Sequence, residues 1–228
     1  MKIAVAANGN AGRLIVKEAL ERGMDVTAIV RSANQTEAKQ VIRKDIMDLT
    51  KEDLQGFDVV VDAFGVWDEA KMNLHSVTLG HLADILSGSS TRLLVVGGAG
   101  SLYTDKTHSL KLSETPDFPK DYLPVANGMG QALDELRRRN DVKWTYISPA
   151  AEFDPEGKKT GSYVLAGEEF TVNEKGESYI SYADYAVALV DEAEKGNHIR
   201  ERISVRKSMV RVPPPDPPFC PEDRKNST

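Results

Sequence analysis

Two glycines near the start of the chain, Gly9 and Gly12, have a spacing that can hold a phosphate group. Both follow a short apolar run, residues 2–7, and Gly12 lies at the start of residues 11–22, where apolar side chains recur with helical spacing. A turn between a strand and a helix leaves backbone N–H groups unpaired at the positive end of the helix dipole, where a pyrophosphate can bind without a basic side chain. An ordinary turn that binds nothing can have the same residues. Our hypothesis is a pyrophosphate site made of Asn8, Gly9, Asn10, Ala11 and Gly12.

One residue departs from the usual glycine pattern at such a site. In the pattern Gly-x-x-Gly-x-x-Gly, the first position is occupied here by Ala6. If this position requires a positive φ angle, alanine costs roughly 1 kcal/mol and its Cβ atom crowds the bound group. We therefore expect Ala6 to weaken binding without abolishing it.

A second apolar run, residues 25–31, ends on Arg31. A strand, a helix and a second strand in this order form the βαβ unit of a parallel sheet. In folds that bind dinucleotides, the end of the second strand contacts the adenosine ribose. An acidic residue there binds the 2′-hydroxyl of NAD, whereas an arginine accommodates the 2′-phosphate of NADP. Arg31 therefore predicts NADP as the preferred cofactor with NAD possible, and the alternative interpretation is an exposed arginine on a loop.

An acidic turn follows the next predicted strand. Residues 41–44 form a weak third strand, and Asp45 and Ile46 come directly after it. This short acidic turn can meet the adenine through its backbone and its carboxylate, although Asp48 could equally cap the short helix expected over residues 50–54. We therefore include Asp45 and Ile46 among the expected cofactor contacts.

Two later apolar runs end in glycine. Residues 57–65 are apolar on both faces, as expected for a central parallel strand, and residues 91–97 form a fifth strand. Ligands of open α/β sheets bind outside the carboxyl ends of the strands. The residues at the end of the fourth strand are therefore expected along the cofactor, namely Ala63, Phe64 and Gly65.

The remaining elements are predicted from apolar periodicity. Helices are expected over residues 50–54, 68–86 and 128–139 and from Ser181 onward, and strands over residues 142–147 and 198–205. The helix over residues 68–86 is expected to bury Val77, and the strand over residues 198–205 is expected at the edge of the sheet. Residues 102–126 have no sustained period and are expected to form a functional loop, such as a lid over a site.

These elements predict an α/β fold with a doubly wound parallel sheet, in a single domain of residues 1–206. Within it, residues 151–180 lose the alternation of strands and helices and are expected to form a small cap above the sheet. Residues 207–228 contain six of the eleven prolines of the chain. They are expected to form an extended proline-rich tail outside the sheet.

Composition excludes several classes of partner. The net charge is −6 and the pI is about 5.3, which argues against nucleic acid, because binding its phosphates requires a basic stripe. No apolar stretch is long enough to span a membrane, and Met1 leads directly into a core strand, so we expect no signal peptide and a cytoplasmic location. No metal site is expected, because Cys220 is the only cysteine and His75 and His81 are six residues apart.

Several motifs together resemble those of a known family. They are LLVVGGAGSL at residues 93–102, SPAA at 148–151, KTGSY at 159–163, ISYADYA at 180–186 and HIRER at 198–202. In these motifs the chain, from residue 1 to about residue 206, resembles the atypical short-chain dehydrogenase/reductases of the NAD(P)H-binding, NADH-flavin reductase-like family. Relatives of that family include the biliverdin-IX-beta/flavin reductases, which are similar to it in fold.

The resemblance implies a Rossmann-type domain, an NAD(P) cofactor across the strand ends, and reductase activity toward flavins or quinones. By the same resemblance, residues 9–12 would bind the pyrophosphate, Arg31 the adenosine side and residues 63–65 the ribose. Gly97 and Gly98 would lie on the nicotinamide side.

The chain departs from the standard chemistry of this superfamily. Its standard members use a tyrosine with a lysine four residues further on, which lowers the pKa of the tyrosine for proton transfer. Here Ala126 follows Tyr122 at this spacing, and Thr107 follows Tyr103. A flavin or a quinone accepts a hydride with little help from side chains, because the acceptor itself stabilises the charge. If a proton donor is needed, Tyr122 and Ser101 are the candidates; otherwise both are packing residues of a loop.

The expected partner is therefore a small flat molecule, a flavin or a quinone, and the chain is expected to be a monomer or a homodimer. One alternative is a redox-sensing regulatory protein that binds NAD(P) without catalysis and acts through a partner, with the proline-rich tail as an arm. Another is a sugar-nucleotide epimerase, which ranks last because it requires the missing Tyr-x-x-x-Lys pair.

Overall fold

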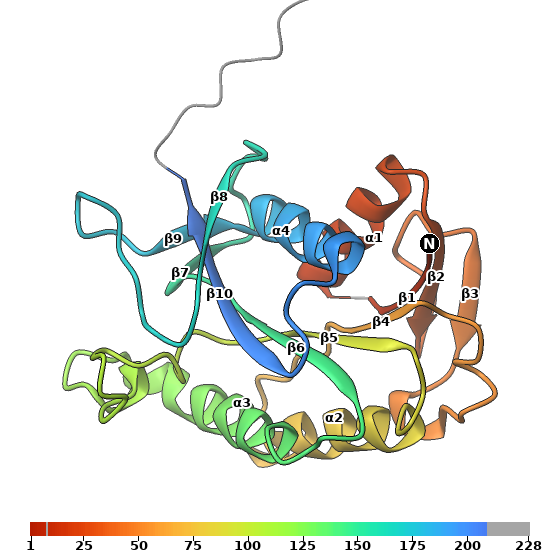
Figure 1. Cartoon of the computed structure of the whole chain (residues 1–228), viewed down its shortest axis with the longest axis horizontal. Helices are drawn as coiled ribbons and strands as arrows, with labels where there is room; N and C mark the ends of the chain where they lie inside the picture. Colours follow the sequence, from red (N-terminus) through yellow and green to blue (C-terminus); the bar gives the residue numbers. More distant parts are fainter. Residues whose placement is uncertain (8, 209–228) are drawn as a thin grey trace, which may run out of the picture.

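A sheet of eight strands forms the centre of the molecule in the computed structural model, which describes residues 1–7 and 9–208 (Figure 1). The strands are β1 (Lys2–Ala6), β2 (Asp25–Val30), β3 (Gln40–Arg43), β4 (Val59–Asp62), β5 (Arg92–Val96), β6 (Lys143–Ser148), β8 (Tyr163–Ala166) and β10 (Glu201–Lys207). They lie in the order β3, β2, β1, β4, β5, β6, β10, β8, and only β8 runs antiparallel to its neighbour. The strand order reverses between β1 and β4, which is the usual position of a ligand in such sheets.

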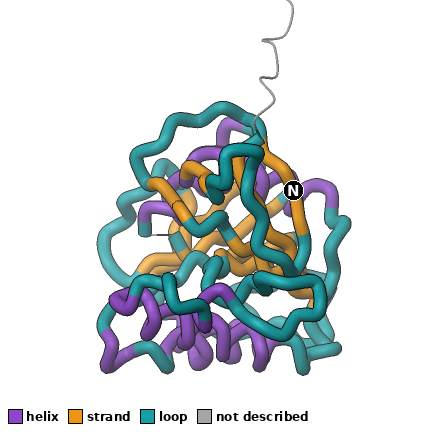
Figure 2. Tube along the Cα trace, turned by 90° about the vertical axis from the view of Figure 1, so that its left-hand side faces the viewer, coloured by secondary structure: helices purple, strands orange, loops and turns teal. Residues whose placement is uncertain are grey.

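Helices cover both faces of this sheet. The helices α1 (Asn10–Glu21) and α4 (Tyr182–Lys195) pack together on one face, and α2 (Leu74–Ile85) and α3 (Leu123–Leu136) pack together on the other (Figures 1 and 2). A mostly parallel sheet with helices on both faces is a doubly wound α/β fold. The predicted fold class is therefore confirmed.

Each face of the sheet has its own hydrophobic core, because successive side chains of a strand point in opposite directions. In β1, Ile3 and Val5 belong to the core that contains α1 and α4 residues, whereas Ala4 and Ala6 belong to the core that contains α2 and α3 residues. Strands buried on both faces read as continuous apolar runs, which is why β1 and β4 were recognisable in the sequence.

Gly12 determines how closely α1 approaches β1. A Cβ atom on Gly12 would lie 2.6 Å from the Cα atom of Ala7 and 3.0 Å from its carbonyl oxygen. No side chain fits in that space, so α1 packs directly on the backbone that leaves β1. The first turn of the helix is thereby fixed beside the carboxyl end of the strand.

The positive φ angle considered for Ala6 does not occur. Ala6 is the last residue of β1 and pairs with Ile29 of β2 and Asp62 of β4. Among the described residues other than glycine, only His108 and Arg200 have a positive φ. Alanine therefore fits this position without backbone strain.

The predicted helix over residues 68–86 is divided in two. A short 3-10 turn, η2 (Glu69–Lys71), precedes α2, and the carboxylate of Asp68 closes that turn by accepting the backbone N–H of Ala70. Val77, which was expected to be buried, is 43% exposed. The prediction treated residues 68–86 as one continuous helix, and this assumption placed Val77 on the wrong face.

No helix forms over residues 50–54. The 3-10 helix η1 (Ile46–Asp48) precedes them instead, and the carboxylate of Asp45 accepts the backbone N–H of Met47 at its start. The carboxylate of Asp53 accepts the backbone N–H of Thr50, which holds the following residues in turns. These local side-chain bonds compete with helix formation.

The helix predicted over residues 128–139 begins earlier, at Leu123, as α3. Pro124 lies in its first turn, where the missing N–H group is not needed by the helix. Reading Pro124 as part of a loop therefore placed the start of the helix too late.

β10 is not an edge strand, contrary to the expectation for residues 198–205. It lies between β6 and β8, and β8 comes from the region predicted as a cap. The edges of the sheet are formed by β3 and β8. β10 also extends to Lys207, the first residue of the predicted tail, whereas residues 209–228 with Cys220 lie outside the described residues.

The cap and the long loop are joined to each other. Besides β8, the cap contains β7 (Glu152–Asp154) and β9 (Tyr179–Ser181), which form a two-stranded parallel sheet. The loop contains the short helices η3 (Leu112–Glu114) and η4 (Lys120–Tyr122). Its residue Tyr103 donates its backbone N–H to the carbonyl oxygen of Glu168, and the carbonyl oxygen of Tyr103 accepts the backbone N–H of Phe170. The loop is therefore fixed against the cap by backbone hydrogen bonds.

Arg202 of β10 connects the loop, the cap and the sheet. Its side chain is fully buried and forms an ion pair with Glu168 of the cap. Its Nη2 atom also donates to the carbonyl oxygen of Ser101 at 3.3 Å. Arg137 at the end of α3 pairs with the same carboxylate at 2.6 Å. Burial of a charge requires such partners, so these groups hold one another in place.

Replacing Gly12 with alanine is expected to lower the free energy of unfolding by about 2 kcal/mol, because the new Cβ atom forces α1 away from the backbone of Ala7. Urea unfolding followed by circular dichroism measures the change. The matched control is Gly9→Ala, whose Cβ atom meets no atom within 4 Å and which should stay within about 0.5 kcal/mol of the parent. Equal stability of the two variants would contradict the packing role of Gly12.

Candidate functional site

The N-terminus of α1 has the geometry of an anion site. Gly9 immediately precedes the helix and has no side chain to cap the N–H groups of its first turn. A Cβ atom on Gly9 would meet no atom within 4 Å, so the space beside the turn is open. These N–H groups lie at the positive end of the helix dipole. A pyrophosphate fits this arrangement, and of the five residues proposed for it only Asn8 lies outside the described residues.

Arg13 is a basic residue of this turn that the sequence analysis missed. Its guanidinium donates to the Oδ1 atom of Asn10, and its Nη1 atom lies 3.5 Å from the Oε1 atom of Gln35. Gln35 belongs to the connection between β2 and β3, so Arg13 links the start of α1 to the strand end that carries Arg31. A lone arginine on a helix has no pattern of its own, and only its distance from the glycine turn could have drawn attention to it.

Arg31 and Asp45 lie together at the carboxyl ends of β2 and β3. The Nη1 atom of Arg31 is 3.7 Å from the Oδ2 atom of Asp45, and the Arg31 side chain is 77% exposed. An exposed ion pair contributes little energy, so the guanidinium is available to another anion. Ile46, in contrast, is buried in the core that faces α2 and α3, and its contact with the adenine stays a prediction.

Residues 63–65 leave the sheet where the strand order reverses. Ala63 and Phe64 are half-buried, and Gly65 is exposed with no atom within 4 Å of a Cβ position. The Phe64 ring packs edge-on against the ring of His75, with centroids 5.7 Å apart. The backbone after β4 is therefore firmly held and open to one side, as a ligand contact requires.

Gly97 and Gly98 have a packing role that the sequence did not reveal. A Cβ atom on Gly97 would lie 2.2 Å from the ring of Tyr146, and one on Gly98 would lie 3.0 Å from the sulfur of Met129. The Tyr146 hydroxyl accepts the Gly98 N–H at 3.3 Å and donates to the Met129 carbonyl at 3.4 Å. These glycines make room for a buried ring and for α3, and their contact with a nicotinamide stays a prediction.

Asp62 is a buried acid at the site that sequence analysis did not single out. It ends β4, is 5% exposed, and accepts the Phe64 N–H at 3.0 Å. Burial raises the pKa of Asp62 to about 6, because loss of water disfavours the charged form. A cavity of about 10 Å³, close to the size of one water molecule, lies between Asp62, His75 and Tyr146. A buried acid with a raised pKa at a strand end is a candidate member of a functional site.

The two candidate proton donors lie in different surroundings. Tyr122 is 51% exposed, and its ring meets that of Trp67 edge to face with centroids 5.8 Å apart. Ser101 is buried, and its hydroxyl has no hydrogen-bond partner among the described residues. It lines a polar cavity of about 500 Å³ between residues 111–114 and α3. Of the two, only Tyr122 is beside the segment that follows β4.

Groups of side chains that could hold a metal ion and helices that could cross a membrane are both absent from residues 1–7 and 9–208. In this part of the chain, no three histidine, cysteine or acidic side chains are grouped so that they could hold a metal ion. Nor does any helix there have the length and apolar character needed to cross a membrane.

Comparison with known proteins gives matches over most of the chain. The model of a family described as NAD(P)H-binding matches residues 6–195. The uncharacterised protein YwnB of Bacillus subtilis strain 168 is 48% identical over 209 residues, which cover 90% of this chain and 98% of YwnB.

Solved structures are similar as well. The crystal structure of SP1627 from Streptococcus pneumoniae TIGR4, called "a putative NADH-flavin reductase", is 55% identical with a TM-score of 0.89, covering 91% of this chain and 100% of SP1627. That of a "putative epimerase" from Bacteroides thetaiotaomicron is 31% identical with a TM-score of 0.79, covering 90% of this chain and 95% of that protein.

Replacing Asp62 with asparagine is expected to stabilise the protein at pH 8. The folded state keeps the Asp62 proton up to about pH 6, whereas the unfolded chain releases it near the usual pKa of 3.8. The folded state thus binds more protons in this window, and the stability of the parent falls as the pH rises through it. Asparagine does not titrate, and its amide oxygen can still accept the Phe64 N–H.

The expected gain in the free energy of unfolding is about 2 kcal/mol at pH 8 and decreases toward pH 4, as urea titrations at several pH values would show. The exposed Asp48→Asn is the control and should show no such gain. A gain for Asp62→Asn that is independent of pH would contradict the burial of a titrating acid.

Proposed function

The chain belongs to the NAD(P)H-binding family, and we propose that it is a cytoplasmic reductase that prefers NADPH and transfers a hydride to a flat acceptor, a flavin or a quinone. The observation that carries this proposal is the N-terminus of α1, where the N-cap residue Gly9 provides no side-chain cap and has open space beside it. It lies at the point of the sheet where the strand order reverses between β1 and β4. The name given to SP1627 supports a flavin as the acceptor.

Residues at three strand ends would hold the cofactor. We assign the pyrophosphate to residues 9–12, the ribose to residues 63–65 and the nicotinamide side to Gly97 and Gly98. A bound nicotinamide supplies the hydride, and the protein supplies position. Packing of Gly97 against Tyr146 and of Phe64 against His75 fixes these strand ends before any ligand arrives.

Two arginines support a preference for NADPH. Arg31 is exposed, and its partner Asp45 is 3.7 Å away, which is longer than a good ion pair. A 2′-phosphate carries close to two negative charges and would compete effectively with that carboxylate. Arg13, on the neighbouring turn of α1, adds a second positive charge on the same side, since it contacts Gln35 of the loop after Arg31.

The missing acid–base pair favours a flat acceptor. None of the seven tyrosines of the chain is followed by a lysine four residues further on. Burial raises the pKa of Tyr146 to about 12 and raises the pKa of Tyr185 well above its usual value, and both hydroxyls donate to backbone carbonyls. Reduction of an isolated carbonyl and epimerisation both require proton transfer. A flavin or a quinone takes a hydride with little such help.

Replacing Arg31 with alanine is expected to weaken NADPH binding about tenfold and to leave NADH binding within about twofold, because only NADPH has the 2′-phosphate. Calorimetric titration of both cofactors measures the difference. Arg138→Ala, an exposed arginine at the end of α3, is the control. An equal loss for both cofactors would show that Arg31 does not read the ribose.

Purified protein is expected to oxidise NADPH when riboflavin or menadione is present, which the decline in NADPH absorbance measures. Gly9→Ala should raise the Kd for NADPH about tenfold while the protein stays folded, because its Cβ atom enters the space assigned to the pyrophosphate. Tight NADPH binding without oxidation for either acceptor would instead favour the non-catalytic redox sensor. Unchanged binding in Gly9→Ala would place the pyrophosphate elsewhere.

A further inference from the structure

Two exposed aromatic side chains form a corner on the segments that border the site. Trp67 follows β4, and Tyr122 ends η4, just before α3. Their ring centroids are 5.8 Å apart with an interplanar angle of 81°, and Trp67 is 69% exposed. We propose that this aromatic corner, Trp67 with Tyr122, binds the ring of the flat acceptor; the proposal rests on the reductase function proposed above.

The geometry of the corner suits a flat conjugated ring. Because the two rings stand at nearly a right angle, a ligand ring can stack on the face of one of them while its edge contacts the other. Aromatic rings attract one another in both the offset-stacked and the edge-to-face arrangement. A third ring can therefore lie flat on Trp67 while its edge meets Tyr122, or the reverse. Large apolar rings left in water are otherwise unfavourable, so a ligand that covers them gains binding energy.

The corner is continuous with the strand ends assigned to the cofactor. Gly65, which is exposed and has open space beside it, lies two residues before Trp67. On the other side, burial and then the nearby Tyr122 raise the pKa of Tyr182. Tyr182 begins α4 and packs on Phe153 of β7 with centroids 3.8 Å apart. Tyr182 thus lies within electrostatic range of Tyr122.

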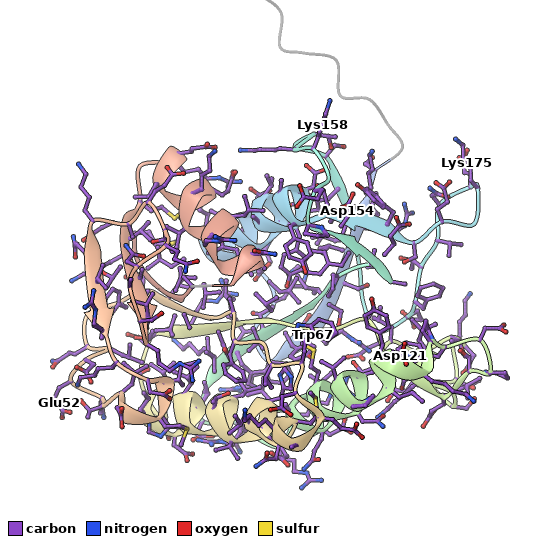
Figure 3. All side chains as sticks on the ribbon, turned by 180° about the vertical axis from the view of Figure 1, so that it is seen from behind. Glu52, Trp67, Asp121, Asp154, Lys158 and Lys175 are labelled. Carbon is purple, nitrogen blue, oxygen red and sulfur yellow. The ribbon has the colours of Figure 1, made fainter. Side chains whose placement is uncertain are left out.

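The surroundings of the corner indicate a small molecule rather than a protein. The residues next to it in the chain are charged and exposed, namely Asp68, Glu69, Lys71, Lys120 and Asp121. Figure 3 shows Trp67 and Asp121 on the same side of the molecule. A stable protein interface needs about 800 Å² from each partner, which two rings enclosed by charges do not provide. The apolar area suits one ring system.

The chain contains a built-in reporter for this proposal. It has two tryptophans, and Trp144 is 3% exposed with its indole N–H bonded to the carbonyl of Arg139. Riboflavin is titrated into the protein saturated with NADP⁺, so that no hydride is transferred. Riboflavin stacked on Trp67 is expected to quench saturably the tryptophan emission of the parent. In Trp67→Phe only Trp144 remains, and the contact quenching by a stacked flavin is expected to be lost, which leaves only energy transfer from Trp144 to the bound flavin.

Steady-state kinetics give a second readout. Trp67→Ala is expected to raise the KM for riboflavin about tenfold, which corresponds to the loss of one ring stack, and Tyr122→Ala should act in the same direction. Trp67→Phe, which keeps a flat ring, should raise it by about threefold. Val77→Ala, an exposed apolar residue on α2, is the matched control. The Kd for NADPH, measured by calorimetry, reports whether the cofactor site of each variant is intact.

The outcomes separate the two proposals. Parent-like KM values in Trp67→Ala and Tyr122→Ala, with no quenching that depends on Trp67, would overturn the aromatic corner and leave the reductase standing. Quenching that depends on Trp67 without NADPH oxidation would support the corner and overturn the reductase. A loss of dimer in Trp67→Ala, measured by light scattering, with an unchanged KM would assign the corner to contact with a second copy and overturn the proposal.

Discussion

The contact between Gly12 and the backbone of Ala7 is the constraint on which the candidate site depends. Because no Cβ atom fits between them, α1 starts beside the carboxyl end of β1, and the N–H groups of its first turn face the space next to Gly9. A helix displaced by the width of one side chain would carry the positive end of its dipole away from the crevice between β1 and β4. It would also carry Arg13 away from Gln35 and the strand end of Arg31. The turn between β1 and α1 therefore determines both how the helix packs on the sheet and where its N–H groups can bind a ligand.

Much of the fold could be predicted from the sequence because its central strands are buried on both faces. The apolar runs of β1 and β4 and the helical spacing of α1 reflect burial that recurs within a few residues. The errors occurred where distant residues, or single side chains that bond to the nearby backbone, decide the structure. β10 was expected at an edge because nothing near it in the chain shows that β8, from the cap, pairs with its outer side. The division of residues 68–86 into two helices depends on the carboxylate of Asp68. The spacing of apolar residues does not reveal such a hydrogen bond.

The candidate site was predictable in position but not in detail. Glycines at strand ends indicated the rim of the sheet, yet Gly97 is required by the ring of Tyr146, which lies far along the chain. Asp62 looks like any acid at the end of an apolar run, and only tertiary burial raises its pKa. Trp67 is exposed, which its residue type alone does not indicate. Residue type indicates what chemistry is available, whereas the environment of that residue is set by elements remote in sequence.

The position of β10 inside the sheet affects how the protein can be made. The chain leaves the ribosome from its N-terminus, and β10 is the last strand in the described part of the chain, yet it fills the gap between β6 and β8. Until residues 201–207 are synthesised, β6 has an open edge, β8 has no partner strand, and Glu168 lacks the guanidinium of Arg202. Open strand edges pair readily with other chains. The nascent protein is therefore most vulnerable to aggregation just before β10 is inserted. A chain whose synthesis stops before residue 201 keeps the edge of β6 unpaired and leaves β8 without a partner strand.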